Sequence, residues 1–201
     1  MIPALGSLHT GRLVLAPLDP LQAADQATTY ALLRDIRLAG PGRGDGAGFA
    51  AGAALGALIG FTGCAVQFAH AAAAASGPWL RLPPPNAAPR LLWGRNSRPP
   101  RCPDCAAALR PWRERLTASP EGLGPGTQPG LCCDARTELH CDACGSANPT
   151  YRWRWGQHAG AGRSFVLIEE VFPGEARPLP ALMQALAGLG AGPWTFFYVQ
   201  D

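Results

Sequence analysis

Seven cysteines stand out in the sequence, and four of them form two pairs with the spacing Cys-x-x-Cys. A tight turn with this spacing directs two thiolates to one side, and two such turns can enclose Zn²⁺ in a tetrahedron of sulfur atoms. Gly145 follows the second pair and permits the positive φ that such a turn favours, whereas Ala106 holds the same place after the first. Four thiolates leave no coordination site for water, which argues against catalysis at the metal. The sequence therefore predicts a structural zinc site with four ligands: Cys102, Cys105, Cys141 and Cys144.

The segment that contains these pairs resembles the zinc-ribbon group of proteins. The resemblance rests on the run Cys-Pro-Asp-Cys at 102–105 and the run Cys-Asp-Ala-Cys-Gly at 141–145, and it covers only residues 101–148. It implies a structural metal held by two turns on two hairpins, and often a surface that binds a protein or a nucleic acid. It carries no information about the residues on either side.

Three further residues offer alternative ligands to the metal: Cys132, Cys133 and His140. Adjacent cysteines rarely both bind one metal well, so we expect these residues to be bystanders, each an alternative to one member of a pair. A redox role is the competing interpretation, but a redox Cys-x-x-Cys usually begins a helix after a strand and needs no second pair. The odd number of cysteines and their pairing favour a metal in a reducing cytoplasm over a framework of disulfides.

Arginine and tryptophan are concentrated around the cysteine pairs. Three interpretations of this stay open: a small packed core beneath a solvated arginine surface, a contact surface for a partner protein, and binding of single-stranded nucleic acid by phosphate neutralisation and base stacking. The net charge of only +3 favours a protein partner over a nucleic acid. The residues that would contact a nucleic acid are Arg95, Arg98, Arg101, Arg113 and Trp112.

The sequence carries no recognised enzyme motif, so we assign no catalytic residue and no organic cofactor. HExxH and GxSxG are absent, and the absence of lysine excludes a phosphate-binding GxxxxGKS/T loop and lysine-dependent chemistry. Glu169 and Glu170 are adjacent in a predicted strand and would point to opposite faces. Cys64 stands in an apolar run and is expected in the core. The alternative function is an enzyme whose active site lies outside the cysteine-rich segment.

The elements that must position the cysteines are predicted from hydrophobic periodicity. Strands are expected at 12–16, 79–82, 164–172 and 194–199, and a strand-like alternation involves Cys64, Val66 and Phe68. A helix is expected from 20 to 36 with Asp19 as its N-cap, and another is expected over 179–189. A stripe of small and apolar residues from Gly48 to Ile59 predicts a third, buried helix. Loops are expected at 40–48 and 119–130.

This order of elements predicts an α+β sandwich of a small sheet with helices, interrupted by a zinc-ribbon module. A split βαβ, ferredoxin-like arrangement is one candidate for the sandwich. The chain of 201 residues, 47% of them hydrophobic, is expected to comprise an N-terminal half at 1–88, the module at 89–156 and a C-terminal part at 157–201. All its basic residues are arginine, which is typical of a GC-rich bacterial coding background. The uncharged stretch 48–66 is the one candidate membrane span, and its Ala and Gly content favours a buried soluble segment.

Overall fold

The fold is built on an antiparallel sheet of six strands. The computed structural model describes residues 11–62, 77–117 and 131–200. From one edge to the other, the strands of this sheet are β13 (Trp194–Gln200), β1 (Gly11–Pro17), β11 (Val166–Glu169), β5 (Trp79–Arg81), β3 (Phe49–Ala51) and β2 (Ala39–Gly42). Every neighbouring pair in this order is antiparallel. Together with its helices, the sheet confirms the predicted α+β class.

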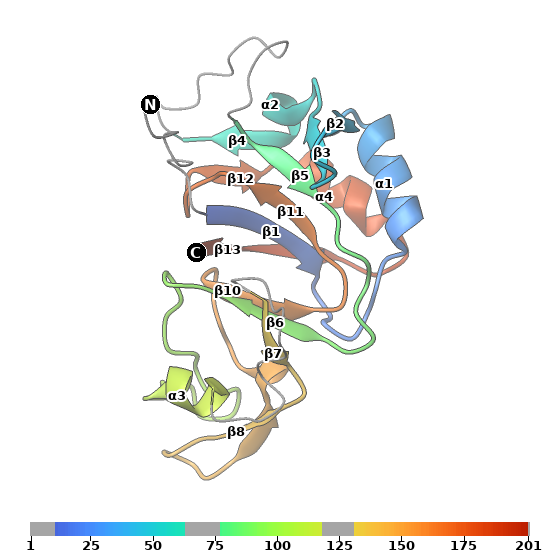
Figure 1. The fold of residues 1–201 in the computed structure, drawn as a ribbon. Helices are drawn as coiled ribbons and strands as arrows, with labels where there is room; N and C mark the ends of the chain where they lie inside the picture. Colours follow the sequence, from blue (N-terminus) through green and yellow to red (C-terminus); the bar gives the residue numbers. More distant parts are fainter. Residues whose placement is uncertain (1–10, 63–76, 118–130, 201) are drawn as a thin grey trace.

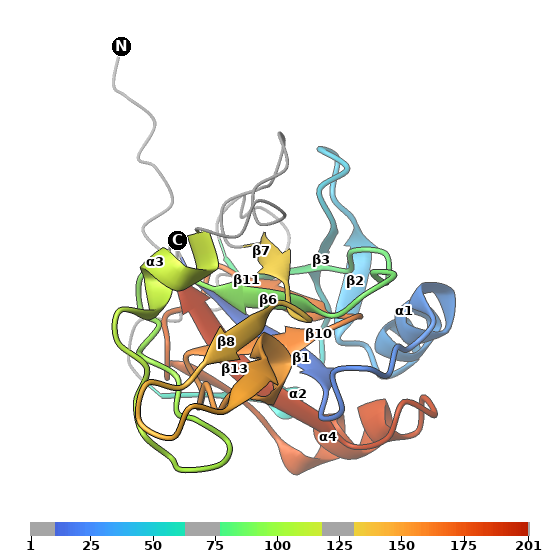
Figure 2. The same ribbon diagram turned by 90° about the horizontal axis from the view of Figure 1, so that it is seen from below.

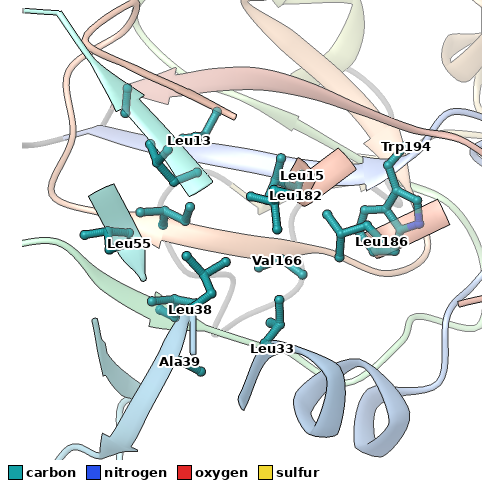
Figure 3. Close-up of a cluster of buried hydrophobic side chains, with 14 of the residues drawn as sticks. Leu13, Leu15, Leu33, Leu38, Ala39, Leu55, Val166, Leu182, Leu186 and Trp194 are labelled. Atoms are coloured by element: carbon teal, nitrogen blue, oxygen red, sulfur yellow. The ribbon is translucent and has the colours of Figure 1, made fainter. Parts of the chain in front are cut away.

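Two helices pack on one face of the large sheet, α1 (Gln26–Asp35) and α4 (Pro180–Ala187) (Figure 1). Leu13 and Leu15 of β1 contribute fully buried side chains to this layer, and Leu33 of α1 and Leu182 of α4 meet them from the helices (Figure 3). The short helix α2 (Leu55–Leu58) and the two-stranded sheet of β4 (Ile59–Phe61) and β12 (Ala176–Pro178) extend the same core. Burial of these apolar side chains supplies the main stabilisation of the α+β domain.

The opposite face of the large sheet is covered by a second sheet. Its strands lie in the order β10 (Ala159–Gly162), β6 (Arg90–Trp93) and β7 (Leu131–Asp134), and Figure 2 shows them in front of β1 and β13. Close packing requires glycine here, because a Cβ at Gly160 would lie 2.4 Å from the ring of Phe197. Adjacent side chains of β6 belong to two different hydrophobic cores, because they point to opposite faces of the strand. Leu92 packs against the large sheet, and Leu91 packs into the cysteine-rich part.

The edge of β13 is closed by residues from outside the large sheet. The backbone N–H of Tyr198 donates to the carbonyl of Gln157, and the N–H of Arg95 donates to the carbonyl of Gln200. The side-chain amide of Asn96 makes two further bonds, donating to the carbonyl of Tyr198 over 3.0 Å and accepting from the N–H of Gln200 over 2.9 Å. Asn96 thereby replaces a peptide unit of a neighbouring strand.

A pair of buried charged residues, Arg12 and Glu169, interrupts the apolar packing of the large sheet. Glu169 of β11 is 7% exposed and lies opposite Arg12 of β1. Its carboxylate contacts the Arg12 guanidinium at 3.1 Å and the Arg81 guanidinium at 2.7 Å. A buried carboxylate needs such partners, because the free energy of transferring an isolated charge out of water is prohibitive.

The predicted strands at 12–16, 79–82, 164–172 and 194–199 are confirmed as β1, β5, β11 and β13, and the helix at 179–189 is confirmed as α4. The predicted start of the first helix is wrong. Asp19 accepts a hydrogen bond from the N–H of Leu21 in a turn, and the N-cap is Asp25, whose carboxylate accepts from the N–H of Thr28. The hydrogen bonds that Asp25 accepts lower its pKa, first among them the one from the N–H of Thr28.

The predicted loop is confirmed over residues 43–48, which join β2 to β3, although its first residues belong to β2. The predicted helix at 48–59 is wrong. Strands β2 and β3 form a hairpin across this region, and only Leu55–Leu58 is helical. The small residues serve close backbone contacts, because a Cβ at Gly48 would lie 2.1 Å from the carbonyl oxygen of Leu80 and one at Gly52 would lie 2.1 Å from that of Arg37. The predicted strand around Cys64 and the loop at 119–130 lie outside the described residues. No helix in the described ranges has the length and apolar character of a membrane span.

Candidate metal centre

Two short hairpins present the cysteine pairs. The second pair lies on the turn between β8 (Glu138–His140) and β9 (Ala147–Pro149), which are antiparallel. The first pair lies between Arg101 and Ala108, which form an isolated antiparallel bridge. Arg101 forms a second bridge with Arg154, so the chain that leaves the second hairpin is fastened to the first. We call residues 89–156 the cysteine module.

The two cysteine turns have the same backbone hydrogen bonds. The N–H of Ala106 donates to the carbonyl of Cys102, and the N–H of Gly145 donates to the carbonyl of Cys141. Ala106 and Gly145 both have positive φ, 61° and 74°. The turn type therefore dictates this conformation even at Ala106, where a side chain makes it less favourable than at a glycine.

The four sulfur atoms converge on one point. All four lie within 4.8 Å of one another, with 3.8 Å between Cys102 and Cys144 and 3.6 Å between Cys105 and Cys141. A regular tetrahedron around Zn²⁺ with Zn–S bonds of about 2.3 Å has sulfur–sulfur edges of about 3.8 Å. A disulfide would require sulfurs about 2.05 Å apart. The four predicted ligands are thus brought together at the spacing that a metal ion needs.

The first cysteine of each pair is buried and the second is exposed. Cys102 is 0% exposed and Cys141 is 4% exposed, and both belong to the hydrophobic core of the module, whereas Cys105 and Cys144 face solvent. That core includes residues from α3 (Trp112–Thr117) and from the segment after the 3₁₀-helix η1 (Thr150–Arg152). The candidate metal centre therefore has two sulfur ligands in the core of the module and two at its surface.

Without a cation, the thiols of Cys102, Cys105 and Cys144 compete for ionisation. Burial alone would raise the pKa of Cys102, but hydrogen bonds from Ser146 and from backbone amides outweigh it and lower the pKa to about 6. A backbone hydrogen bond from Ala107 favours the Cys105 thiolate, but burial and the three neighbouring sulfurs raise its pKa to about 12. A hydrogen bond with Ser146 lowers the pKa of Cys144. A divalent cation displaces the protons from such a cluster, because its ligands bind as thiolates.

Ser146 contacts two sulfurs of the cluster, and the sequence analysis does not predict this. Its hydroxyl lies 3.2 Å from the sulfur of Cys144 and 3.5 Å from that of Cys102. The Asn148 amide donates to this hydroxyl over 3.4 Å and to the Asp104 carboxylate over 2.7 Å, which links the two turns. The equivalent residue of the first turn is Ala107, so only the second turn supplies a hydroxyl. The one feature of the sequence that could have indicated this contact is that a hydroxyl residue directly follows the run Cys-Asp-Ala-Cys-Gly.

We predict that Ser146→Ala weakens zinc binding about 10- to 100-fold, a typical effect of losing an outer-shell hydrogen bond to a metal ligand. When zinc is bound every sulfur is a thiolate, so Ser146 is the only possible donor in its two sulfur contacts. A competition titration against a chelating dye measures the affinity. Ser146→Thr keeps the hydroxyl and is expected to retain most of the affinity. An affinity of Ser146→Ala within twofold of the parent would contradict this role.

Two arginines lie side by side next to the first cysteine turn. Arg101 and Arg154 are opposite each other in their bridge, where like charges normally destabilise. The Arg101 guanidinium donates to the carbonyl of Ala106 over 3.2 Å, and that of Arg154 donates to the carbonyl of Pro103 over 3.1 Å. The sulfurs of this turn become thiolates when a cation binds, and their negative charge would then offset the repulsion between the two guanidinium groups.

Comparisons with protein-family models, curated proteins and solved structures found no match. The chemistry of the site therefore follows from its donor atoms and their spacing.

The tryptophans around the metal centre are core residues. Trp112, Trp153 and Trp155 are at most 7% exposed. Trp112 contacts Trp93 and Trp155 edge-to-face, with ring centroids 5.2 and 5.3 Å apart. Arg113, predicted as a nucleic-acid contact, covers these rings with its guanidinium 4.9 Å from the centroid of Trp112. The interpretation of these aromatics as packing residues accounts for their burial, and Trp112 presents no open face for a base.

Among the described side chains, that of His140 is not part of the four-cysteine cluster. His140 is exposed, and its backbone carbonyl accepts from Arg115, which also binds Asp142 over 2.8 Å. Cys132 and Cys133 lie in β7, and their side chains are not among those described.

The α+β part offers two open hollows for an alternative active site. One of about 590 Å³ lies between α1 and α4 and includes Asp35, and one of about 630 Å³ lies beside Leu18 and includes Asp19. Each has a single titratable residue among its described lining residues, whereas acid–base or nucleophilic chemistry needs convergent groups. The hollows give no support to a catalytic role.

Proposed function

We propose that Cys102, Cys105, Cys141 and Cys144 hold one structural Zn²⁺. The observation that carries the proposal is the spacing of the four sulfurs, whose shorter contacts of 3.6 and 3.8 Å are close to the edges of a Zn–S tetrahedron. Soft thiolate ligands select zinc over magnesium or calcium, and a full set of four leaves no position for a reacting water. The charges of Arg101 and Arg154 suit a centre in which four thiolates exceed the charge of the cation by two.

Two features of the fold support the architecture that the sequence predicts, a ferredoxin-like sandwich with an inserted zinc-ribbon module. The cysteine turns lie on two hairpin-like pairings, β8 with β9 and Arg101 with Ala108, as in a zinc ribbon. In the large sheet, the order β13-β1-β11-β5, with α1 after β1 and α4 before β13, is that of a split βαβ, ferredoxin-like core. We infer that the chain is a ferredoxin-like domain with a zinc-ribbon module inserted between β5 and β11, while β2 and β3 widen the sheet.

We propose that this zinc-bound module serves to bind a partner protein. The metal and the buried tryptophans give the module a rigid core, and exposed arginines surround it, Arg95, Arg98 and Arg152 among them. Arginine is favoured at protein interfaces because its planar fork forms paired hydrogen bonds with carboxylates. A binding role fits a site of four thiolate ligands, which leaves no position for a reacting water.

Metal analysis of the purified chain tests the zinc assignment. We expect one zinc per chain, and we expect chelation to abolish the near-ultraviolet circular dichroism of the packed tryptophans, because the ligands Cys102 and Cys141 belong to the core in which these tryptophans pack. Zinc added back should restore the signal, whereas magnesium should not. A chain that contains no zinc and keeps the same spectrum after chelation would refute the structural site.

A further inference from the structure

The proposed zinc centre presents two of its four sulfur ligands to solvent. Cys105 and Cys144 are exposed, and so are the residues on either side of them: Asp104, Ala106, Ala143 and Gly145. These neighbours have short side chains, so a small dissolved molecule reaches both sulfurs. A cysteine is oxidised by peroxide when it is accessible and is a thiolate, and the cysteine ligands of a bound zinc ion are thiolates. Cys105 and Cys144 meet both conditions once zinc is bound.

Each exposed sulfur contacts a buried sulfur of the other turn. The sulfur of Cys105 lies 3.6 Å from that of Cys141, and the sulfur of Cys144 lies 3.8 Å from that of Cys102. Cys102 and Cys141 are only 0% and 4% exposed, so an oxidant from solvent reaches the exposed member of each contact first. Because a disulfide bond is about 2.05 Å long, an approach of less than about 2 Å joins either contact. An oxidised Cys105 or Cys144 therefore has a resolving thiolate beside it on the other turn.

The two exposed sulfurs differ in the hydrogen bonds that they accept. Each accepts one from the backbone N–H of the residue two positions later, Ala107 for Cys105 and Ser146 for Cys144. The Ser146 hydroxyl also lies 3.2 Å from the sulfur of Cys144 and donates to it when that sulfur is a thiolate, whereas Ala107 has no hydroxyl. An additional donor stabilises the thiolate and lowers the nucleophilicity of its sulfur. Cys105 is therefore the stronger nucleophile of the two exposed ligands.

We propose that the metal centre is a peroxide-sensitive switch, in which a disulfide between Cys105 and Cys141 forms and the zinc ion leaves. This inference rests on the proposed function, because it requires zinc bound to the four cysteines. The Cys105 thiolate attacks hydrogen peroxide, so that an S–O bond forms while the O–O bond breaks, and the hydroxide that leaves takes a proton from solvent to become water. The Cys141 thiolate then attacks the sulfur of this sulfenic acid. The S–S bond replaces the S–O bond, and a second hydroxide leaves and becomes water.

Oxidation of one sulfur pair removes half of the ligand set. The two sulfurs together give up two electrons and the peroxide receives them, so the zinc ion leaves without a change in its oxidation state. Only Cys102 and Cys144 remain as thiolates, which is too few for a structural zinc site of four ligands. A dithiol that reduces the disulfide regenerates all four ligands. The oxidation state of Cys105 and Cys141 thereby controls whether the partner-binding module holds its metal.

Titration of the reduced, zinc-loaded full chain with hydrogen peroxide tests the proposal. A zinc-sensitive dye measures the released ion, and we expect about one zinc per disulfide formed. Arginines separate the two cysteine pairs in the sequence and none lies within a pair, so trypsin places each pair in its own peptide. A disulfide across the turns joins these two peptides, whereas a disulfide within a turn does not. Mass spectrometry of the joined peptides should assign the bond to Cys105 and Cys141, and dithiothreitol with added zinc should restore the metal.

Two variants make the test specific. A dimedone label for sulfenic acid should modify Cys105 about fivefold more than Cys144, and Ser146→Ala in excess zinc should bring this ratio below about twofold. Cys64→Ser/Cys132→Ser/Cys133→Ser is the matched control, which removes the three cysteines outside the assigned ligand set. It should change the rate of zinc release less than about twofold, because the reacting sulfurs are ligands.

Zinc content before and after peroxide separates the possible failures. A zinc-loaded chain that keeps its metal in excess peroxide, or whose disulfides lie within the two turns, would overturn the switch and leave the metal assignment intact. Zinc loss with only sulfinic and sulfonic acids, which dithiothreitol does not reduce, would overturn the switch in the same way. Absence of zinc from the folded chain before oxidation would overturn the proposed function itself.

Discussion

Replacement of Cys102 by serine is expected to abolish zinc binding and to unfold the cysteine module. The side chain is 0% exposed and belongs both to the four-sulfur cluster and to the hydrophobic core of the module. Structural zinc sites contribute on the order of 10 kcal/mol of binding free energy to folding, more than a small core can replace. Zinc content should fall below about 0.1 per chain, and limited proteolysis should cleave within residues 101–155 while the α+β domain resists.

The exposed ligand Cys144 provides a graded comparison. Cys144→Ser should also release the metal but should leave the buried core of the module less disturbed, because this side chain faces solvent. Cys132→Ser/Cys133→Ser is the matched control and should keep one zinc per chain if these residues are bystanders. Full zinc retention in Cys102→Ser/Cys144→Ser would refute the assigned ligand set.

Replacement of Glu169 by alanine is expected to cost about 3–5 kcal/mol of the free energy of unfolding, because it leaves two guanidinium groups in the sheet without their carboxylate. The side chains of Glu169 and Arg12 are 9% and 7% exposed, and that of Arg81 is 21% exposed, so water replaces little of the lost interaction. For a chain of this size the midpoint of thermal unfolding should fall by about 6–20 °C.

Urea unfolding followed by tryptophan fluorescence measures this change. The control is Asp45→Ala, which removes the carboxylate from an exposed pair with Arg43 and should cost less than about 1 kcal/mol. A similar small loss in Glu169→Ala would show that the buried carboxylate is dispensable for stability.

The sequence is sufficient to predict the parts of the molecule in which a short run of residues is compatible with only one local structure. Paired Cys-x-x-Cys turns can approach each other in few ways, and the apolar runs of β1, β11 and β13 are long enough to be identified as strands. The choice of Asp25 over Asp19 as N-cap has no such signal. It depends on the chain before α1, where the N–H of Ala24 donates to the hydroxyl of Ser164, a residue distant in sequence.

The small residues between 48 and 59 show why helical spacing alone is insufficient. Gly48 and Gly52 are spaced as on one helical face, but each permits a close backbone contact with a different segment. Ser146 presents the same difficulty at the metal centre, because its role depends on two sulfurs from separate turns. Contacts that join distant segments determine these features, and a single sequence does not reveal which segments meet.

The side-chain amide of Asn96 covers the edge of β13 by hydrogen bonds to Tyr198 and Gln200. Because Asn96 belongs to the cysteine module, loss of the metal could affect whether this edge is open to a second copy of the chain. An open edge strand offers unsatisfied N–H and carbonyl groups to any other strand, including the same strand of a second copy. Of the groups that occupy this edge, Arg95 and Asn96 belong to the cysteine module and Gln157 directly follows it. Loss of zinc that loosens these residues would free β13 while the α+β domain is still folded. Metal starvation would then expose β13 as a template for aggregation.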